Sequence, residues 1–228
     1  SVMTSMTSRI TEDAETVRDQ LDQLLAANPV VPVVVVDSAA QGVGAGRALV
    51  AGGIATAEVA FRTAAAVEAI RVMGEVEGLV VGAGTVLDAA QAEAAIDAGA
   101  RYLVSPGLSV EVVRCARGAG VPVLPGCADA SWIMAALELG IRTVKFFPAS
   151  ALGGPSAVRA LSAAFPRVRF VPTGGVSAGN LAEYLAVPQV AACGGSWMVS
   201  RELVAAARWD EISRLCARAV AIAKEAGR

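Results

Sequence analysis

One pattern recurs along most of this 228-residue chain: a short apolar run, then a glycine, proline or threonine, then an alanine-rich stretch. The repeat length is about 20 to 25 residues, which suits one strand followed by one helix. The runs that have the length of strands are 30–36, 55–61, 79–82, 102–105, 122–124, 143–147, 169–171 and 187–193. Stretches between them, such as 88–98 and 110–117, carry apolar residues at helical spacing, and glycines end several of them. Eight such units without a polar linker predict an α/β fold, a single (β/α)8 TIM barrel. An open doubly wound sheet is the alternative, because a strand count alone does not close a barrel.

The two ends of the chain complete the predicted domain. An additional N-terminal helix is expected over about 11–26, and a C-terminal helix that runs to about Ala226. We expect residues 1–10 to be a flexible N-terminal segment and residues 11–228 to form the barrel domain. The first residues lack a basic segment followed by an apolar core and a cleavage site, so no secretion signal is expected.

Composition excludes several classes of function. No apolar run approaches the roughly 18 residues of a membrane-spanning helix. With a net charge of -2 and 4% aromatic residues, the chain lacks the positive charge and the stacking side chains by which proteins bind nucleic acid, so small-molecule partners are expected. The four cysteines form no paired motif, and we expect them to be reduced in a cytoplasmic protein. The absence of histidine excludes histidine triads and nearly all catalytic zinc sites, so no metal is expected.

A single lysine, Lys145, lies inside an apolar strand-like run. Burial disfavours the charged form of an amine, which then becomes a nucleophile suited to forming a Schiff base with a carbonyl. Alternation of side chains places Glu58 and Arg62 on one face of the second strand, and Lys145 and Phe147 on one face of the sixth. If the opposite faces pack on helices, Glu58 and Lys145 both point into the barrel. They then form an acid–base pair or merely a buried ion pair, and Arg62, nearer the rim, offers a planar fork for a carboxylate.

Glycine-rich turns follow the last two predicted strands. Gly174-Gly175 and Gly195-Ser196 allow backbone N–H groups to approach an anion closely, and phosphate sites are frequent at these positions of TIM barrels. Ordinary turn glycines are the alternative. Such a rim would offer a lysine for a ketone, an arginine for a carboxylate and a site for a phosphate. A substrate that carries all three groups is a phosphorylated 2-keto acid.

Several of these motifs, in this order, resemble the 2-keto-3-deoxy-6-phosphogluconate (KDPG) aldolases, a family that also cleaves 4-hydroxy-2-oxoglutarate (KHG). The segments that carry the resemblance are 52–63, 82–87, 105–107, 145–149, 172–175 and 194–197. The resemblance implies a class I aldolase, a lyase that cleaves KDPG to pyruvate and glyceraldehyde 3-phosphate in the Entner–Doudoroff pathway. It also implies a homotrimer that works without metal or cofactor.

The resemblance further implies a role for individual residues. Lys145 would form the Schiff base and Glu58 would act as general acid and base. Arg62 and Thr85 would bind the carboxylate of the keto acid. The residues that would line the pocket are Pro106 and Phe147, and those that would take the phosphate are Gly174, Gly175, Gly195 and Ser196.

The chain departs from the family pattern after the fifth strand, where Asp129 and Trp132 stand in place of the usual Thr and Glu. Asp129 would add a negative charge in the pocket, or it would cap the following helix. This departure leaves other functions open: an aldolase for a related 4-hydroxy-2-keto acid such as 2-keto-3-deoxy-6-phosphogalactonate, a phosphate-binding isomerase or epimerase, or a non-catalytic keto-acid binding protein.

Overall fold

The structure, a computed structural model, describes the backbone of residues 2–228 and the side chains of residues 15–228. Within this part of the chain, eight parallel strands form one sheet in the order β7-β6-β5-β4-β3-β2-β1-β8. The strands are β1 Val30–Val34, β2 Thr56–Ala60, β3 Val80–Gly84, β4 Leu103–Ser105, β5 Val123–Cys127, β6 Thr143–Phe146, β7 Arg169–Pro172 and β8 Cys193–Gly195. Two parallel bridges, Phe170 to Val190 and Thr173 to Gly194, join β7 to the β8 side and close the ring. The predicted (β/α)8 barrel is confirmed.

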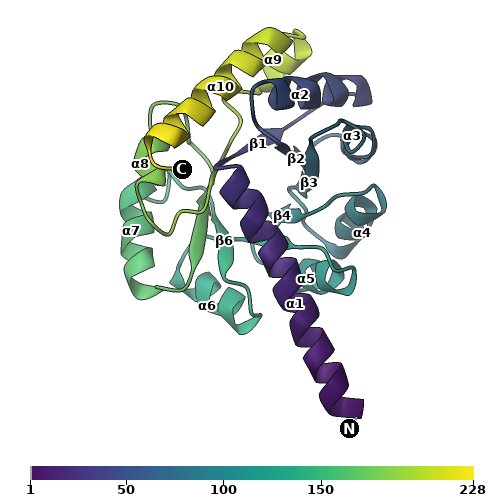
Figure 1. Ribbon diagram of the computed structural model, residues 1–228, viewed down its shortest axis with the longest axis vertical. Coiled ribbons are helices and arrows are strands. Elements are labelled where there is room, and N and C mark those ends of the chain that lie inside the picture. The colour runs from purple at the N-terminus through teal and green to yellow at the C-terminus, as the bar shows by residue number, and fades with distance from the viewer. Residues whose placement is uncertain (1) are drawn as a thin grey trace.

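Helices surround the barrel, as Figure 1 shows. Their bounds are α1 Val2–Ala27, α2 Ala39–Ala51, α3 Ala66–Met73, α4 Ala89–Asp97, α5 Val110–Gly118, α6 Ala130–Glu138, α7 Gly154–Ala164, α8 Leu181–Leu185, α9 Arg201–Ala205 and α10 Trp209–Glu225. Five of them begin at a described residue whose side chain accepts a hydrogen bond from a backbone N–H of the first turn: Ser38, Asp88, Ser109, Asp129 and Ser200. These caps follow the C-terminal ends of β1, β3, β4, β5 and β8, so they help to build the rim on which the site was predicted.

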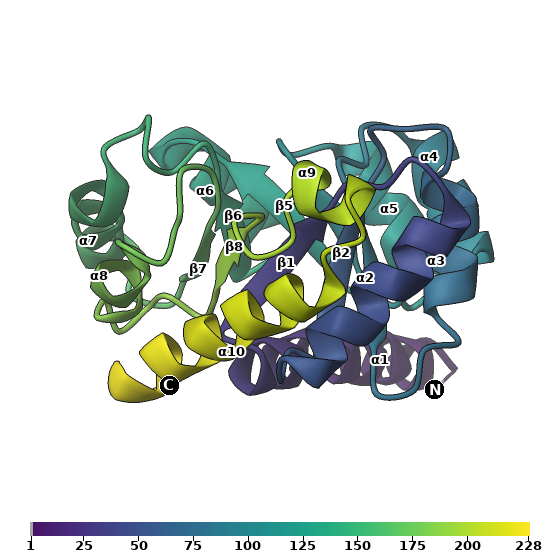
Figure 2. The same ribbon diagram turned by 90° about the horizontal axis from the view of Figure 1, so that it is seen from above.

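Helix α1 lies across the N-terminal end of the barrel and extends beyond it (Figures 1 and 2). Leu21 and Leu25 are buried there against residues of the barrel interior, among them Val104 and Val171. The helix begins at Val2, earlier than the expected start near Thr11, so residues 2–10 are helical here. The flexibility expected for residues 1–10 stays a prediction, and Ser1 lies outside the described residues.

Two of the strand predictions need correction. The run 187–193 overlaps β8 only at Cys193, because Val187 closes a turn on Tyr184 and only Cys193–Gly195 pairs with β1. Strand β2 ends at Ala60, because the N–H of Arg62 turns back to the carbonyl of Ala60. Arg62 therefore lies in a turn beyond β2, and the expectation that it shares a strand face with Glu58 is wrong.

Apolar packing divides into two clusters. The larger fills the space between the sheet and the helices, while the smaller lies inside the barrel beneath the rim. No helix in the described part of the chain is long and apolar enough to cross a membrane.

Candidate active site

Lys145 and Glu58 meet inside the barrel, as the alternation of side chains predicted. Nζ of Lys145 on β6 lies 3.6 Å from Oε1 of Glu58 on β2, and the two side chains are 7% and 3% exposed. The two groups are close enough to form an ion pair, but the distance is too long for a hydrogen bond. Oε1 of Glu58 is buried and has no hydrogen-bond partner among the described residues. An orphaned buried carboxylate oxygen is costly, so this atom is available to a hydroxyl or water that enters the site.

Glycines of β3 make room for the side chain of Glu58. A Cβ added at Gly84 would overlap Oε1, Cγ and Cδ of Glu58, so the carboxyl group occupies the space that a side chain at this position would fill. Two residues earlier, Gly82 leaves equivalent space for the ring of Tyr102. Alternate glycines on one strand face indicate that neighbouring side chains cross that face, and this was the signal in the sequence from which these spaces could have been predicted.

A buried hydroxyl pair lies one layer below Glu58. Oη of Tyr102 is 2.8 Å from Oγ1 of Thr56, which also donates to the carbonyl of Val80 at 2.8 Å. Burial raises the pKa of Tyr102 far above its ordinary value; the charge of Glu58 raises it further, against the lowering effect of the Thr56 hydrogen bond. Tyr102 therefore stays protonated at neutral pH and serves as part of the floor. No motif in the sequence predicted the contact between Tyr102 and Thr56.

Two predicted pocket residues lie around the amine of Lys145. The ring of Phe147 is half-buried, with its centroid 5.2 Å from Nζ. Pro106 is held close by backbone packing, since its carbonyl lies against Gly126, where a Cβ would not fit. Gly126 in turn pairs with Lys145 across the β5–β6 ladder. These contacts enclose the amine on the β5 side and towards the rim.

The two residues expected to bind a carboxylate are differently placed. Thr85 follows β3 immediately and is half-buried, and its φ of 53° lies in the left-handed region that a β-branched residue rarely adopts. Arg62 is exposed and makes no ion pair or side-chain hydrogen bond with any residue in the described range. Both lie beyond the C-terminal ends of adjacent strands, so the rim brings them to one side of the barrel, but no hydrogen bond between described atoms joins them.

The glycine turns after β7 and β8 lie side by side, because Thr173 bridges Gly194. Gly174 and Gly175 have φ of 98° and 75°, so the turn depends on glycine. A Cβ at Gly174 would approach Phe147, which connects this turn to the Lys145 pocket. Ser196 is exposed just beyond β8.

Asp129 acts as the N-cap of α6. Its Oδ1 accepts a hydrogen bond of 3.1 Å from the backbone N–H of Trp132, and both residues are exposed. The capping role weighed in the sequence analysis is therefore present. A role in the pocket stays a prediction.

Other features lie away from this rim. A cavity of about 470 Å³ opens between α1 and the N-terminal ends of β5 and β6, but it contains none of the predicted site residues. Burial raises the pKa of the Cys127 thiol to about 12, and the charge of Asp129 contributes, so this thiol is a poor nucleophile.

Comparison with known proteins agrees with this geometry. Residues 21–215 match the family described as KDPG and KHG aldolase. The chain belongs to this family. The 2-dehydro-3-deoxy-phosphogluconate aldolase of Treponema pallidum (strain Nichols) is 49% identical over 82% of this chain and 89% of its own length.

Solved aldolase structures of the family superpose over most of the chain. The Zymomonas mobilis ZM4 2-keto-3-deoxy-6-phosphogluconate aldolase with 3-phosphoglycerate matches with a TM-score of 0.84 and 39% identity, covering 90% of this chain and 97% of that chain. The Legionella pneumophila KDPG aldolase holds pyruvate as a covalent carbinolamine intermediate. It matches with a TM-score of 0.83 and 38% identity, covering 86% of this chain and 96% of that chain.

Proposed function

We propose that the protein is a class I aldolase that reversibly cleaves KDPG to pyruvate and glyceraldehyde 3-phosphate through a Schiff base on Lys145. The observation that carries the proposal is the buried pair of Lys145 and Glu58, 3.6 Å apart, in a chain of the KDPG and KHG aldolase family. A lysine amine with a buried carboxylate beside it has both the nucleophile and the base that imine chemistry requires, and such contacts shorten to hydrogen-bond length when a substrate binds.

The proposed mechanism starts with a proton transfer from Lys145 to Glu58, which leaves the amine free to attack the ketone carbon. Glu58 returns the proton as the carbinolamine loses water, and a protonated imine forms. Glu58 then removes the proton of the 4-hydroxyl group, the adjacent carbon–carbon bond breaks and its electron pair moves into the imine to give an enamine. The aldehyde leaves, the enamine carbon takes a proton, and hydrolysis releases pyruvate.

The remaining residues are proposed to bind the two charged ends of the substrate. Arg62 and Thr85 take the carboxylate, Pro106 and Phe147 enclose the ketone, and the turns at Gly174, Gly175, Gly195 and Ser196 take the phosphate. The adjacency of the β7 and β8 turns, and the contact of one of them with Phe147, support this arrangement. KHG, which has no phosphate, is proposed as a second substrate, with pyruvate and glyoxylate as products.

Borohydride trapping tests the function directly. Reduction in the presence of pyruvate is expected to add the mass of a reduced pyruvyl group to the peptide that contains Lys145, and to no other lysine. Lys145→Ala should take no label and release no aldehyde. Aldehyde release that survives in Lys145→Ala would refute the Schiff-base mechanism, and pyruvate binding without any aldehyde release would indicate a binding protein.

Two further expectations accompany the proposal. The homotrimer implied by the family resemblance and the cytoplasmic location inferred from the unpaired cysteines stay predictions. Sedimentation of the purified protein would test the first.

A further inference from the structure

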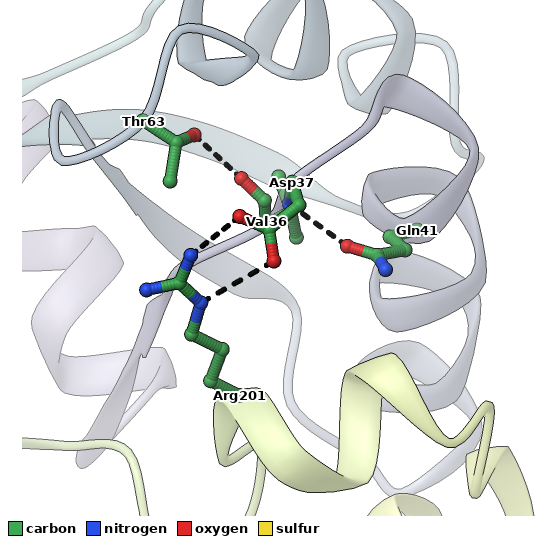
Figure 3. Close-up of polar contacts among 5 residues, drawn as sticks. All are labelled: Val36, Asp37, Gln41, Thr63 and Arg201. Atoms are coloured by element: carbon green, nitrogen blue, oxygen red, sulfur yellow. Dashed lines mark hydrogen bonds and ion pairs between the residues drawn. The ribbon is translucent and has the colours of Figure 1, made fainter.

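Three loops of the rim meet at the segment Val36-Asp37, just beyond β1 (Figure 3). The carboxylate of Asp37 accepts two hydrogen bonds from Arg201, the first residue of α9: Nε to Oδ2 at 3.3 Å and Nη2 to Oδ1 at 2.5 Å. On the other side of the segment, Oγ1 of Thr63 donates to the carbonyl of Val36 at 2.5 Å. Gln41 accepts from the Asp37 N–H at 2.8 Å. The loops after β1, β2 and β8 are thereby connected.

This connection limits how far the carboxylate of Asp37 can lie from Arg62. Arg62 precedes Thr63 in the chain, so the Thr63–Val36 hydrogen bond holds the Cα atoms of Arg62 and Asp37 within about 12 Å of each other. Extended arginine and aspartate side chains that share a hydrogen bond span about 13 Å between Cα atoms. The two side chains are therefore long enough to meet. In the structure its carboxylate instead faces Arg201, and Arg62 is left without an ion-pair partner among the described side chains.

We propose that Arg201 is a positioning residue for the carboxylate site: by pairing with Asp37, it keeps that carboxylate away from Arg62. The inference rests on the proposed function, in which Arg62 binds the carboxylate of the keto acid. Without Arg201, Asp37 is an unpaired anion whose side chain is long enough to reach the unpaired guanidinium of Arg62, and it competes with the substrate for that group. Arg201 thus acts on binding through Asp37 and touches no reacting atom.

This role predicts an asymmetry that a merely structural ion pair does not. Arg201→Gln frees Asp37 and is expected to raise the half-saturating pyruvate concentration about two- to fivefold, the range that corresponds to an exposed ion pair. Asp37→Asn removes the competitor as well as the pair, so it should stay within about twofold of the wild type. The double variant Asp37→Asn/Arg201→Gln should match Asp37→Asn. A structural link between loops would instead make all three variants equally weak.

The experiment is borohydride trapping of the full chain over a range of pyruvate concentrations, with the label on Lys145 read by mass spectrometry. Turnover of KDPG gives a second readout, in which Arg201→Gln should raise KM and leave kcat unchanged, because only binding is affected. Arg201→Lys keeps a cation beside Asp37 and should behave as the wild type. Arg208→Gln, which removes another exposed ion pair, of 2.7 Å to Glu211, is the matched control and should change neither quantity.

The outcomes separate this inference from the proposed function. If the wild-type protein takes no label on Lys145, the proposed function fails and this inference fails with it. If Lys145 is labelled but Arg201→Gln saturates as the wild type does, the inference alone is overturned. Failure of Asp37→Asn to rescue Arg201→Gln overturns it as well.

Discussion

Substitution of Gly84 by alanine should displace the carboxyl group of Glu58 and so prevent its proposed acid–base role, although residue 58 itself is unchanged. The added Cβ would occupy the position of the Glu58 carboxyl group, and because that group ends a flexible side chain, the side chain moves rather than the backbone. Gly84 is not among the glycines with positive φ, so alanine causes no backbone strain. The displaced carboxylate leaves Lys145, its ion-pair partner at 3.6 Å.

The expected magnitudes follow from these contacts. Positioned general acid–base groups contribute about 10²- to 10⁴-fold to rate, so kcat of Gly84→Ala should fall by at least about 10²-fold. Overpacking of a buried site costs about 1 to 3 kcal/mol in the free energy of unfolding. In a Glu58→Ala background the added methyl group enters vacated space, so most of this cost should disappear.

The assay combines pyruvate release with urea unfolding in a double-mutant cycle of Gly84→Ala and Glu58→Ala. Gly118→Ala is the matched control, because a Cβ at Gly118 meets no atom within 4 Å. A Gly84→Ala protein that keeps its activity within about threefold, or a cycle in which the two stability costs simply add, would refute the placement of Glu58 over Gly84.

Three further predictions concern stability and reactivity. Asp129→Ala should lower the free energy of unfolding by about 1 kcal/mol, because the cap of α6 is lost. Asp129→Asn keeps a capping oxygen and should retain most of that stability. An unchanged free energy of unfolding in Asp129→Ala, measured with urea, would rule out the cap. Leu25→Ala should cost about 2 to 5 kcal/mol, because Leu25 is 2% exposed at the floor of the barrel; a smaller loss in thermal or urea unfolding would mean that α1 does not pack there. At pH 8, iodoacetamide should modify the half-buried Cys115 before the buried Cys127. The pKa of Cys127, about 12, leaves almost no thiolate until the pH approaches that value. Peptide mapping that finds Cys127 modified first would contradict this burial.

The sequence predicted those parts of the site that depend on strand periodicity alone. Glu58 and Lys145 each sit within a short strand, so alternation was enough to direct both into the barrel. The position of Arg62 was predicted wrongly because the apolar pattern is the same whether the strand continues past Ala60 or turns there. The contact of Tyr102 with Thr56 depends on the stagger of neighbouring strands, which no local pattern records.

The pair of Asp37 and Arg201 illustrates a further limit. The two residues are 164 positions apart, and each alone is an ordinary exposed charge. Only the pairing of the first strand with the last brings the loops after β1 and β8 together, since β1 pairs with both β2 and β8. The helix cap at Asp129, by contrast, could be predicted from the sequence, because it depends only on the residue type and its place before a helix.

The position of α1 has a consequence for the kinetics of an enzyme built this way. Among the described residues, Leu21 and Leu25 close the N-terminal end of the barrel beneath Lys145, which leaves the rim as the side from which a small molecule approaches the amine. In the proposed mechanism, pyruvate stays bound to Lys145 while the aldehyde leaves towards the rim. Substrates and products must follow one order: in cleavage the aldehyde departs first, and in condensation pyruvate must enter before the aldehyde. Product inhibition by pyruvate should accordingly be competitive with the keto acid, with the aldehyde as a noncompetitive inhibitor.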